Sequence, residues 1–225
     1  MTSQLSFLPD ASISPAGLQY QRDFISERYG HDLVQRTRSL PLQPFQFGAF
    51  EGKRRVASFG WRYDYSEQRL QPAETVLDWI AREIARVEAF GGLLAGAIRQ
   101  VLFTEYEAGA GIGWHRDKPH FEEVFGLSLF SAYKFRFRRW TVGGWQRYTL
   151  GAEPRSLYRT AGESRHVREH SISPVEQIRY SVTFRSMARE VIDAPRWNAV
   201  ATISLSSAYS TSSSGPVKCP SLPTV

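Results

Sequence analysis

The stretch Arg179-Tyr180-Ser181-Val182-Thr183-Phe184-Arg185 alternates strictly between polar and apolar side chains. Successive side chains of a β-strand point to opposite faces, so this alternation predicts a strand with one polar and one apolar face. Two arginines inside a protein are costly unless anions pair with them. The polar face therefore predicts either a site for a small dicarboxylate, which guanidinium groups bind at two points, or a solvated edge strand.

Outward from this stretch, the sequence from Gln100 to Arg185 reads as short segments rich in β-branched and aromatic residues, mostly separated by turn residues. Closely spaced strands of this kind are typical of an antiparallel sandwich or barrel. The predicted strands are Val101–Tyr106, Ile112–His115, Phe125–Phe130, Ala132–Arg138, Trp145–Leu150, Ser156–Thr160 and Ile178–Arg185. Within one of them, Lys134–Arg138 alternates charged and aromatic side chains, which predicts a strand with one wet face.

One helix is predicted ahead of these strands, over residues 73–89. Its apolar residues recur at helical spacing, Pro72 stands just before it, and Gly91-Gly92 follows as a stop signal. A second helix or a turn is expected through residues 93–98. The apolar residues that form the helical stripe are Val76, Leu77, Ile80, Ile84 and Val87.

Three zones are predicted along the 225 residues. Residues 1–70 form an N-terminal extension rich in Pro, Gly and aromatic residues, with strand-like runs such as Arg55–Phe59. Residues 71–189 form the core domain. Residues 190–225 form a polar tail that is expected to be disordered, because Ser206–Pro223 has low complexity and little apolar surface to bury.

Cysteine usage and charge narrow the class of protein. A single cysteine, Cys219, excludes a disulfide framework and a cysteine-based zinc site. The sequence shows neither a secretory signal nor a membrane span, so a cytoplasmic protein is expected. A monomer is expected as well. The net charge of +6 comes from arginine, with only four lysines, and fits a polyanionic partner such as DNA or RNA. Arginine-rich composition without any nucleic-acid partner is the alternative.

A candidate metal site stands in Gly113-Trp114-His115-Arg116-Asp117. On a strand, residues two apart share a face, so His115 and Asp117 can bind one ion side by side. One later histidine completes a face of two histidines and one carboxylate, with three positions left open for cosubstrate and oxygen, as in non-haem iron(II) oxygenases. His170 is the preferred third ligand and His166 the second choice. The motif alone also occurs by chance, as a surface turn or a core pair.

Taken together, His115-Arg116-Asp117, His170 and the stretch Arg179–Arg185 resemble the AlkB-like family of iron(II)- and 2-oxoglutarate-dependent dioxygenases. The resemblance covers residues 40–188. It implies a mainly β fold with flanking helices, a double-stranded β-helix or jelly-roll barrel. It also implies the cofactors iron(II), 2-oxoglutarate and molecular oxygen, and oxidative demethylation of N-alkylated bases in nucleic acid, as in DNA repair.

The resemblance assigns roles to single residues. The metal ligands would be His115, Asp117 and His170. In 2-oxoglutarate binding, Arg179 would pair with the distal carboxylate, Arg185 would serve the metal-proximal end, and Thr104, Tyr106 and Ser181 would assist. The aromatic segment from Arg62 to Ser66 resembles the family's nucleotide-recognition lid. The residues predicted to contact the substrate are Tyr63, Tyr65 and Trp114.

Two positions depart from the family pattern. Ser181 replaces an asparagine, and Pro119 stands where many nucleic-acid demethylases have an acidic residue that reads the methylated base; His120 or Glu122 could substitute for it. Three alternatives therefore stay open. The same chemistry could act on tRNA, a protein side chain or a small metabolite, the barrel could bind nucleic acid without catalysis, or zinc could occupy the three ligands and support hydrolysis.

Overall fold

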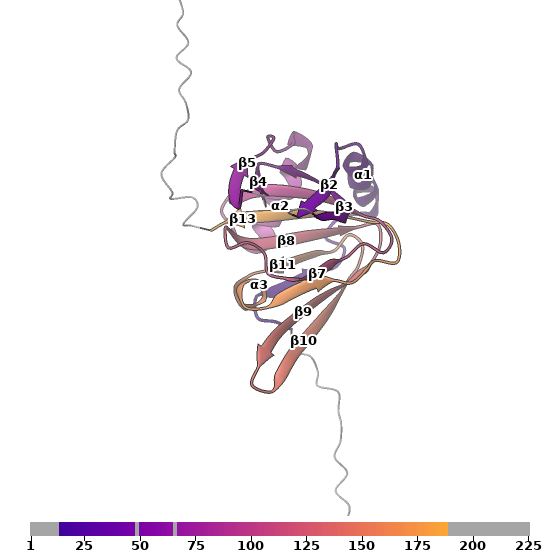
Figure 1. Ribbon diagram of the computed structural model, residues 1–225. Helices are drawn as coiled ribbons and strands as arrows, with labels where there is room; N and C mark the ends of the chain where they lie inside the picture. The colour runs from indigo at the N-terminus through magenta and orange to yellow at the C-terminus, as the bar shows by residue number, and fades with distance from the viewer. Residues whose placement is uncertain (1–13, 48–49, 65–66, 189–225) are drawn as a thin grey trace, which may run out of the picture. The chain divides into compact units, whose positions relative to one another are not determined.

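The computed structural model of the protein describes residues 14–47, 50–64 and 67–188, which form two main antiparallel sheets (Figure 1). The seven-stranded sheet has the order β1 (Leu18–Gln21), β11 (Leu157–Thr160), β8 (Phe121–Leu129), β13 (Arg179–Met187), β6 (Ile98–Tyr106), β3 (Phe50–Phe59) and β2 (Gln43–Phe47). The four-stranded sheet has the order β10 (Gly144–Ala152), β9 (Tyr133–Thr141), β12 (Glu169–Ile172) and β7 (Ile112–His115).

From β6 onward, the chain passes back and forth between the two sheets. Strands β6, β8, β11 and β13 belong to the seven-stranded sheet, whereas β7, β9, β10 and β12 belong to the four-stranded sheet. This alternation is the double-stranded β-helix topology, so the predicted mainly β, jelly-roll fold is confirmed. Strands β1, β2 and β3, from the predicted N-terminal extension, widen the seven-stranded sheet at both edges.

The two faces of β13 separate as its alternation predicts. Its apolar residues Tyr180, Val182 and Phe184 are at most 1% exposed and belong to a core that includes residues of α1 (Glu27–Arg38) and α2 (Ala81–Gly91). A second core includes aromatic residues of β9, such as Phe135 and Phe137. The polar side chains of β13 therefore point to the side of the sheet away from the helices.

Helix α2 begins later than predicted. Residues 73–77 are not helical, and a 3-10 turn, η1 (Asp78–Ile80), precedes α2. The reason is tertiary: the amide of Ala73 donates to the carbonyl of Gly60 at 3.0 Å, and the amide of Gly60 donates to the carbonyl of Glu74 at 2.6 Å. The predicted stop is confirmed, because Gly92 caps α2 in the left-handed region, at φ 66°.

The seven predicted strands are confirmed, β7 with the predicted ends and the other six with shifted ends, while α1, α3 (Gly162–His166), β1, β2 and β12 were not predicted. Arg62 to Asp64 of the predicted lid segment lie on β4 (Trp61–Asp64), which pairs with β5 (Arg69–Pro72) in a separate two-stranded sheet, the lid hairpin. The predicted tail, residues 190–225, lies outside the described residues. Within the described ranges, no helix has both the length and the apolar character needed to cross a bilayer.

Candidate functional site

The structure brings His115, Asp117 and His170 together. His115 ends β7 and lies directly opposite His170 in the β7–β12 pairing, with their ring centroids 4.3 Å apart. Asp117 follows two residues later, and its Oδ2 lies 3.5 Å from Nε2 of His170. One possible ligand atom from each residue lies within 4.8 Å of the others. Two imidazoles and one carboxylate at this spacing can bind a single metal ion on one face.

Both histidines have a ring nitrogen available for a metal. Nδ1 of His115 lies 2.9 Å from the carbonyl oxygen of Gly113, which can only accept, so this nitrogen donates and Nε2 is the ring nitrogen left for a metal. Burial lowers the pKa of His170 to about 4, so its imidazole is neutral at pH 7. A metal ion therefore has no proton to displace from the His170 ring at neutral pH.

Asp117 is ionised despite its burial. Burial opposes the charged carboxylate, but nearby cations, Arg185 first among them, outweigh burial and hold the pKa of Asp117 well below its usual range. Nη2 of Arg185 lies 3.5 Å from Oδ1 of Asp117, and its Nη1 donates to Gln100 at 2.8 Å. Gln100 in turn donates to the carbonyl of Trp61 at 2.7 Å, which links the ligand carboxylate to the lid hairpin.

The loop that carries Asp117 is held by a buried arginine that sequence reasoning missed. Arg165, on α3, is 1% exposed. Its Nη2 donates to the carbonyls of Lys118 and Phe121, each at 2.6 Å, and its Nη1 to the carbonyl of Asp117 at 3.4 Å. A residue that satisfies three carbonyls of one loop fixes where the ligand carboxylate points, and no local motif signals such a contact across 44 or more residues.

Arg179 lies deeper, as a buried cation on the polar face of β13. It is 2% exposed, and its Nε and Nη1 have no hydrogen-bond partner among the described residues. Its guanidinium carbon lies 3.5 Å from the ring centroid of Tyr133 and 4.7 Å from that of Tyr106. The pairings of β13 with β6 and β8 place Ser181 between Thr104 and Ser128, all buried. A buried cation with free donors, beside hydroxyls, needs an anion.

The residues present fit the predicted groups. The three ligands suit iron(II), and the buried donors of Arg179 and Arg185 that lack partners among the described residues suit the two carboxylates of 2-oxoglutarate. The hydroxyls of Thr104, Ser181 and Ser128 line the same polar face. The predicted cosubstrate residues are therefore brought together, and Ser128, Tyr133 and Gln100 join them without having been predicted.

The predicted substrate residues separate. Tyr63, on β4, lies next to the metal loop, with its ring centroid 5.5 Å from that of His120 and 4.8 Å from Nζ of Lys118. Tyr65 lies outside the described residues. Trp114 alternates with His115 on β7 and is packed against Arg136 and Arg138, so the structure does not bring it into the cluster. The second-choice ligand, His166, is not part of the cluster either; its Nε2 lies 3.3 Å from Glu122.

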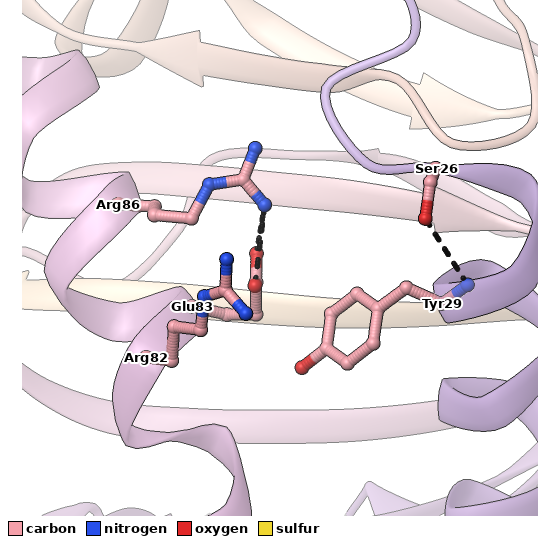
Figure 2. Close-up of a pocket in the computed structure, with 5 residues that line it drawn as sticks. All are labelled: Ser26, Tyr29, Arg82, Glu83 and Arg86. Atoms are coloured by element: carbon pink, nitrogen blue, oxygen red, sulfur yellow. Dashed lines mark hydrogen bonds and ion pairs between the residues drawn. The ribbon is translucent and has the colours of Figure 1, made fainter.

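A separate cavity of about 410 Å³ lies at the helices (Figure 2). Figure 2 shows Tyr29 and Ser26 on one side and Arg82, Glu83 and Arg86 on the other. Nη1 of Arg86 lies 3.0 Å from Oε2 of Glu83, so the buried carboxylate already has its cation. None of the three candidate metal ligands lines this cavity, and it is not the metal site.

The amino-acid sequence is similar to that of one curated protein. A curated protein from Arabidopsis thaliana, the alkylated DNA repair protein ALKBH8 homolog, is 26% identical over 163 residues, 61% of this chain. This chain covers 47% of that relative, about half its length. No protein-family model matches the chain.

Solved structures show the fold. OsALKBH1 has a TM-score of 0.58 at 16% identity, over 77% of this chain and 98% of that one. A prolyl-4-hydroxylase from Pseudomonas putida has a TM-score of 0.54 at 16% identity, over 76% and 93%. An oxidoreductase of the 2OG-Fe(II) oxygenase family from Burkholderia pseudomallei has a TM-score of 0.54 at 15% identity, over 76% and 85%.

The fold is therefore the one found in these oxygenases, and the three candidate ligands stand at a spacing that could hold iron(II). The donor set would fit iron(II), and the arginine donors that lack partners among the described residues would fit 2-oxoglutarate. In sequence the chain is similar to the ALKBH8 homolog, and in fold it is similar to OsALKBH1.

Proposed function

We propose that the protein removes methyl groups from ring nitrogens of bases in nucleic acid. The observation that carries the proposal is the lid contact at the metal loop: Tyr63 lies over Lys118 and His120, one and three residues after Asp117. An aromatic ring, a cation and an imidazole beside the metal are groups that stack on a base and hydrogen-bond its edge. The net charge of +6 favours a polyanionic substrate.

His120 supports base recognition despite Pro119. Its Nδ1 is buried and has no hydrogen-bond partner among the described residues. A buried ring nitrogen without a partner is costly, and a base edge would satisfy it. We therefore assign His120 the role of reading the base that enters beside Tyr63, in place of the acidic residue two positions after the metal-binding aspartate.

The chain's residues would divide the work as follows. His115, Asp117 and His170 would hold iron(II), Arg179 would hold the distal carboxylate of 2-oxoglutarate, and Arg185 would keep Asp117 ionised. When bound, iron(II), 2-oxoglutarate and oxygen supply the oxidation of a methyl C–H bond, which yields succinate, carbon dioxide and formaldehyde. The ring of Tyr63 would stack on the base once it has left the nucleic-acid stack, and the methyl group would then face the metal.

The test is mass spectrometry of a short single-stranded DNA that carries 1-methyladenine and 3-methylcytosine. The oligonucleotide is incubated with protein, iron(II), ascorbate and 2-oxoglutarate, and succinate is measured in parallel. Asp117→Ala removes a metal ligand, and Asp32→Ala, on the exposed face of α1, is the matched control. The expected result is a mass loss of about 14 Da for each methylated base, because hydrogen replaces the methyl group. This loss is expected with the wild type and with Asp32→Ala, but not with Asp117→Ala.

Other outcomes separate the alternatives. Succinate without demethylation would overturn the substrate class and point to tRNA, a protein side chain or a metabolite. Demethylation that survives Asp117→Ala would overturn the metal site. His120→Ala is expected to raise KM for the methylated oligonucleotide while leaving uncoupled succinate formation unchanged, because His120 would touch the base and not the cosubstrate.

A further inference from the structure

The outer face of the four-stranded sheet carries an uncommon set of side chains. Residues opposite each other in an antiparallel pair share a face, and Trp140 pairs with Trp145 while Arg138 pairs with Arg147. Trp114, on β7, joins this face through its contacts with Arg136 and Arg138. We call this set the tryptophan–arginine surface: Trp114, Arg136, Arg138, Trp140, Trp145 and Arg147.

The surface is ordered by stacking. The guanidinium carbon of Arg138 lies 4.4 Å from the ring centroid of Trp114 and 4.2 Å from that of Trp145, so one arginine is held between two indoles. Trp145 contacts Trp140 edge to face, with centroids 5.3 Å apart. Trp140 is nevertheless 67% exposed and Trp145 39% exposed. Aromatic rings that are held in place by packing and remain exposed to solvent can stack on a planar group of a ligand, such as a base.

Charge on the same face is almost entirely positive. Four basic side chains of residues 133–152 lie on this face, and the segment has no acidic side chain: Lys134, Arg136, Arg138 and Arg147. Glu169, the acidic residue of β12, is taken up by Arg138, with Oε2 at 2.7 Å from Nε. Arg147 is exposed and has no ion pair among the described residues. Two copies of this face would repel each other, so a second copy of the chain is disfavoured and a polyanion is favoured.

The tryptophan–arginine surface also lies near the end of the barrel that carries the candidate metal ligands. His170 pairs with Phe137, and β12 begins at Glu169, opposite Arg138. Strand β9 continues to Thr141, three residues further, or about 10 Å at ~3.4 Å per residue. The β9–β10 hairpin therefore extends past the start of β12, and Figure 1 shows the long hairpin of β9 and β10 projecting from the rest of the fold. Its other face is braced on α3, because Nη1 of Arg139 lies 3.0 Å from Oε1 of Glu163.

We propose that the tryptophan–arginine surface binds nucleotides that flank the target base on a single strand of nucleic acid. The indoles would stack on bases, and Arg147, Arg136 and Lys134 would contact phosphates. Exposed aromatic rings that alternate with arginines are how proteins bind single strands without reading sequence. The proposal rests on the proposed function for its class of ligand, but it concerns a different surface and can fail independently.

The test measures binding of a fluorescent single-stranded oligo-dT 15-mer by anisotropy, at several salt concentrations, and needs no turnover. Trp140→Ala is expected to weaken binding about tenfold, the loss of one stacked base, with the salt dependence unchanged. Arg147→Ala is expected to weaken binding and to lower the salt slope by about 0.7, the loss of one phosphate contact. Leu94→Ala and Arg28→Ala are the matched controls: Leu94 is 85% exposed, and Arg28 is an exposed arginine on α1.

Each outcome decides the proposal. Wild-type binding by both Trp140→Ala and Arg147→Ala would overturn it. Trp140-dependent binding to anionic phosphatidylglycerol vesicles without oligo-dT binding, or Trp140-dependent dimers in light scattering, would also overturn it, in favour of a membrane or a second copy. Oligo-dT binding that depends on both residues, without demethylation, would keep this surface and remove the proposed function. Demethylation by the wild type, with unaltered oligo-dT binding in both variants, would keep the proposed function and remove the role of this surface.

Discussion

Arg179→Met should separate cosubstrate binding from folding. The guanidinium is 2% exposed, and its Nε and Nη1 have no partner among the described residues. Two charge-assisted hydrogen bonds to a carboxylate contribute about 1.5–3 kcal/mol each, so their loss should weaken 2-oxoglutarate binding by about a hundredfold or more. Methionine has similar length and no charge to bury. Removal of the buried charge should offset the lost contacts with Tyr133 and Tyr106, leaving metal-free stability within about 1 kcal/mol of wild type.

Two measurements check this prediction. Urea unfolding of the metal-free protein gives the stability, and the rise in Tm with added 2-oxoglutarate, with manganese(II) in place of iron(II), gives the cosubstrate affinity. Arg28→Met, at an exposed position on α1, is the control. A loss of several kcal/mol in stability together with an unchanged response to 2-oxoglutarate would refute the assignment, because Arg179 would then be a structural residue.

Three further predictions follow from the packing and the charges. Arg165→Met removes the donor to the carbonyls of Asp117, Lys118 and Phe121, so it should cost about 2–4 kcal/mol in urea unfolding and weaken manganese binding in calorimetry. Gly126→Ala places a Cβ 2.2 Å from the Tyr158 ring and should cost about 1–3 kcal/mol, whereas Gly151→Ala, with open space around it, should not. Folding lowers the pKa of His170 from 6.5 to about 4. Between these values only the unfolded chain gains the proton, so metal-free stability should fall by about 2 kcal/mol from pH 7 to pH 5, and by less in His170→Gln.

Alternation along single strands could be predicted from the sequence. The separation of Arg179 and Ser181 from Val182 and Phe184 followed from strand geometry alone, and so did the wet face of β9. The same rule, applied to β7, places Trp114 on the face of the strand that points away from His115, which is why Trp114 lies away from the cluster. Helix α1 was missed because Glu27–Arg38 is mostly polar; its buried positions, Gly30, Leu33, Val34 and Thr37, do recur at helical spacing, and Ser26 caps it.

Contacts between distant segments could not be predicted in this way. The early residues of the expected helix are held extended by Gly60, 13 or 14 residues earlier in the chain. Arg165 reaches the Asp117 loop only because α3 packs beside β8, and Gln100 meets Arg185 through strand pairing. Each of these contacts depends on the relative placement of elements, which hydrophobic periodicity does not encode.

The division of the site between the two sheets has a mechanical consequence. His115 and His170 belong to the four-stranded sheet, while Arg179 and Arg185 belong to the seven-stranded sheet. A metal ion chelated by a dicarboxylate that reaches those arginines would cross-link the two sheets. Opening of the sandwich should then slow when both are bound, and amide hydrogens of β7 and β12, a pair at the edge of the smaller sheet, should exchange more slowly with solvent.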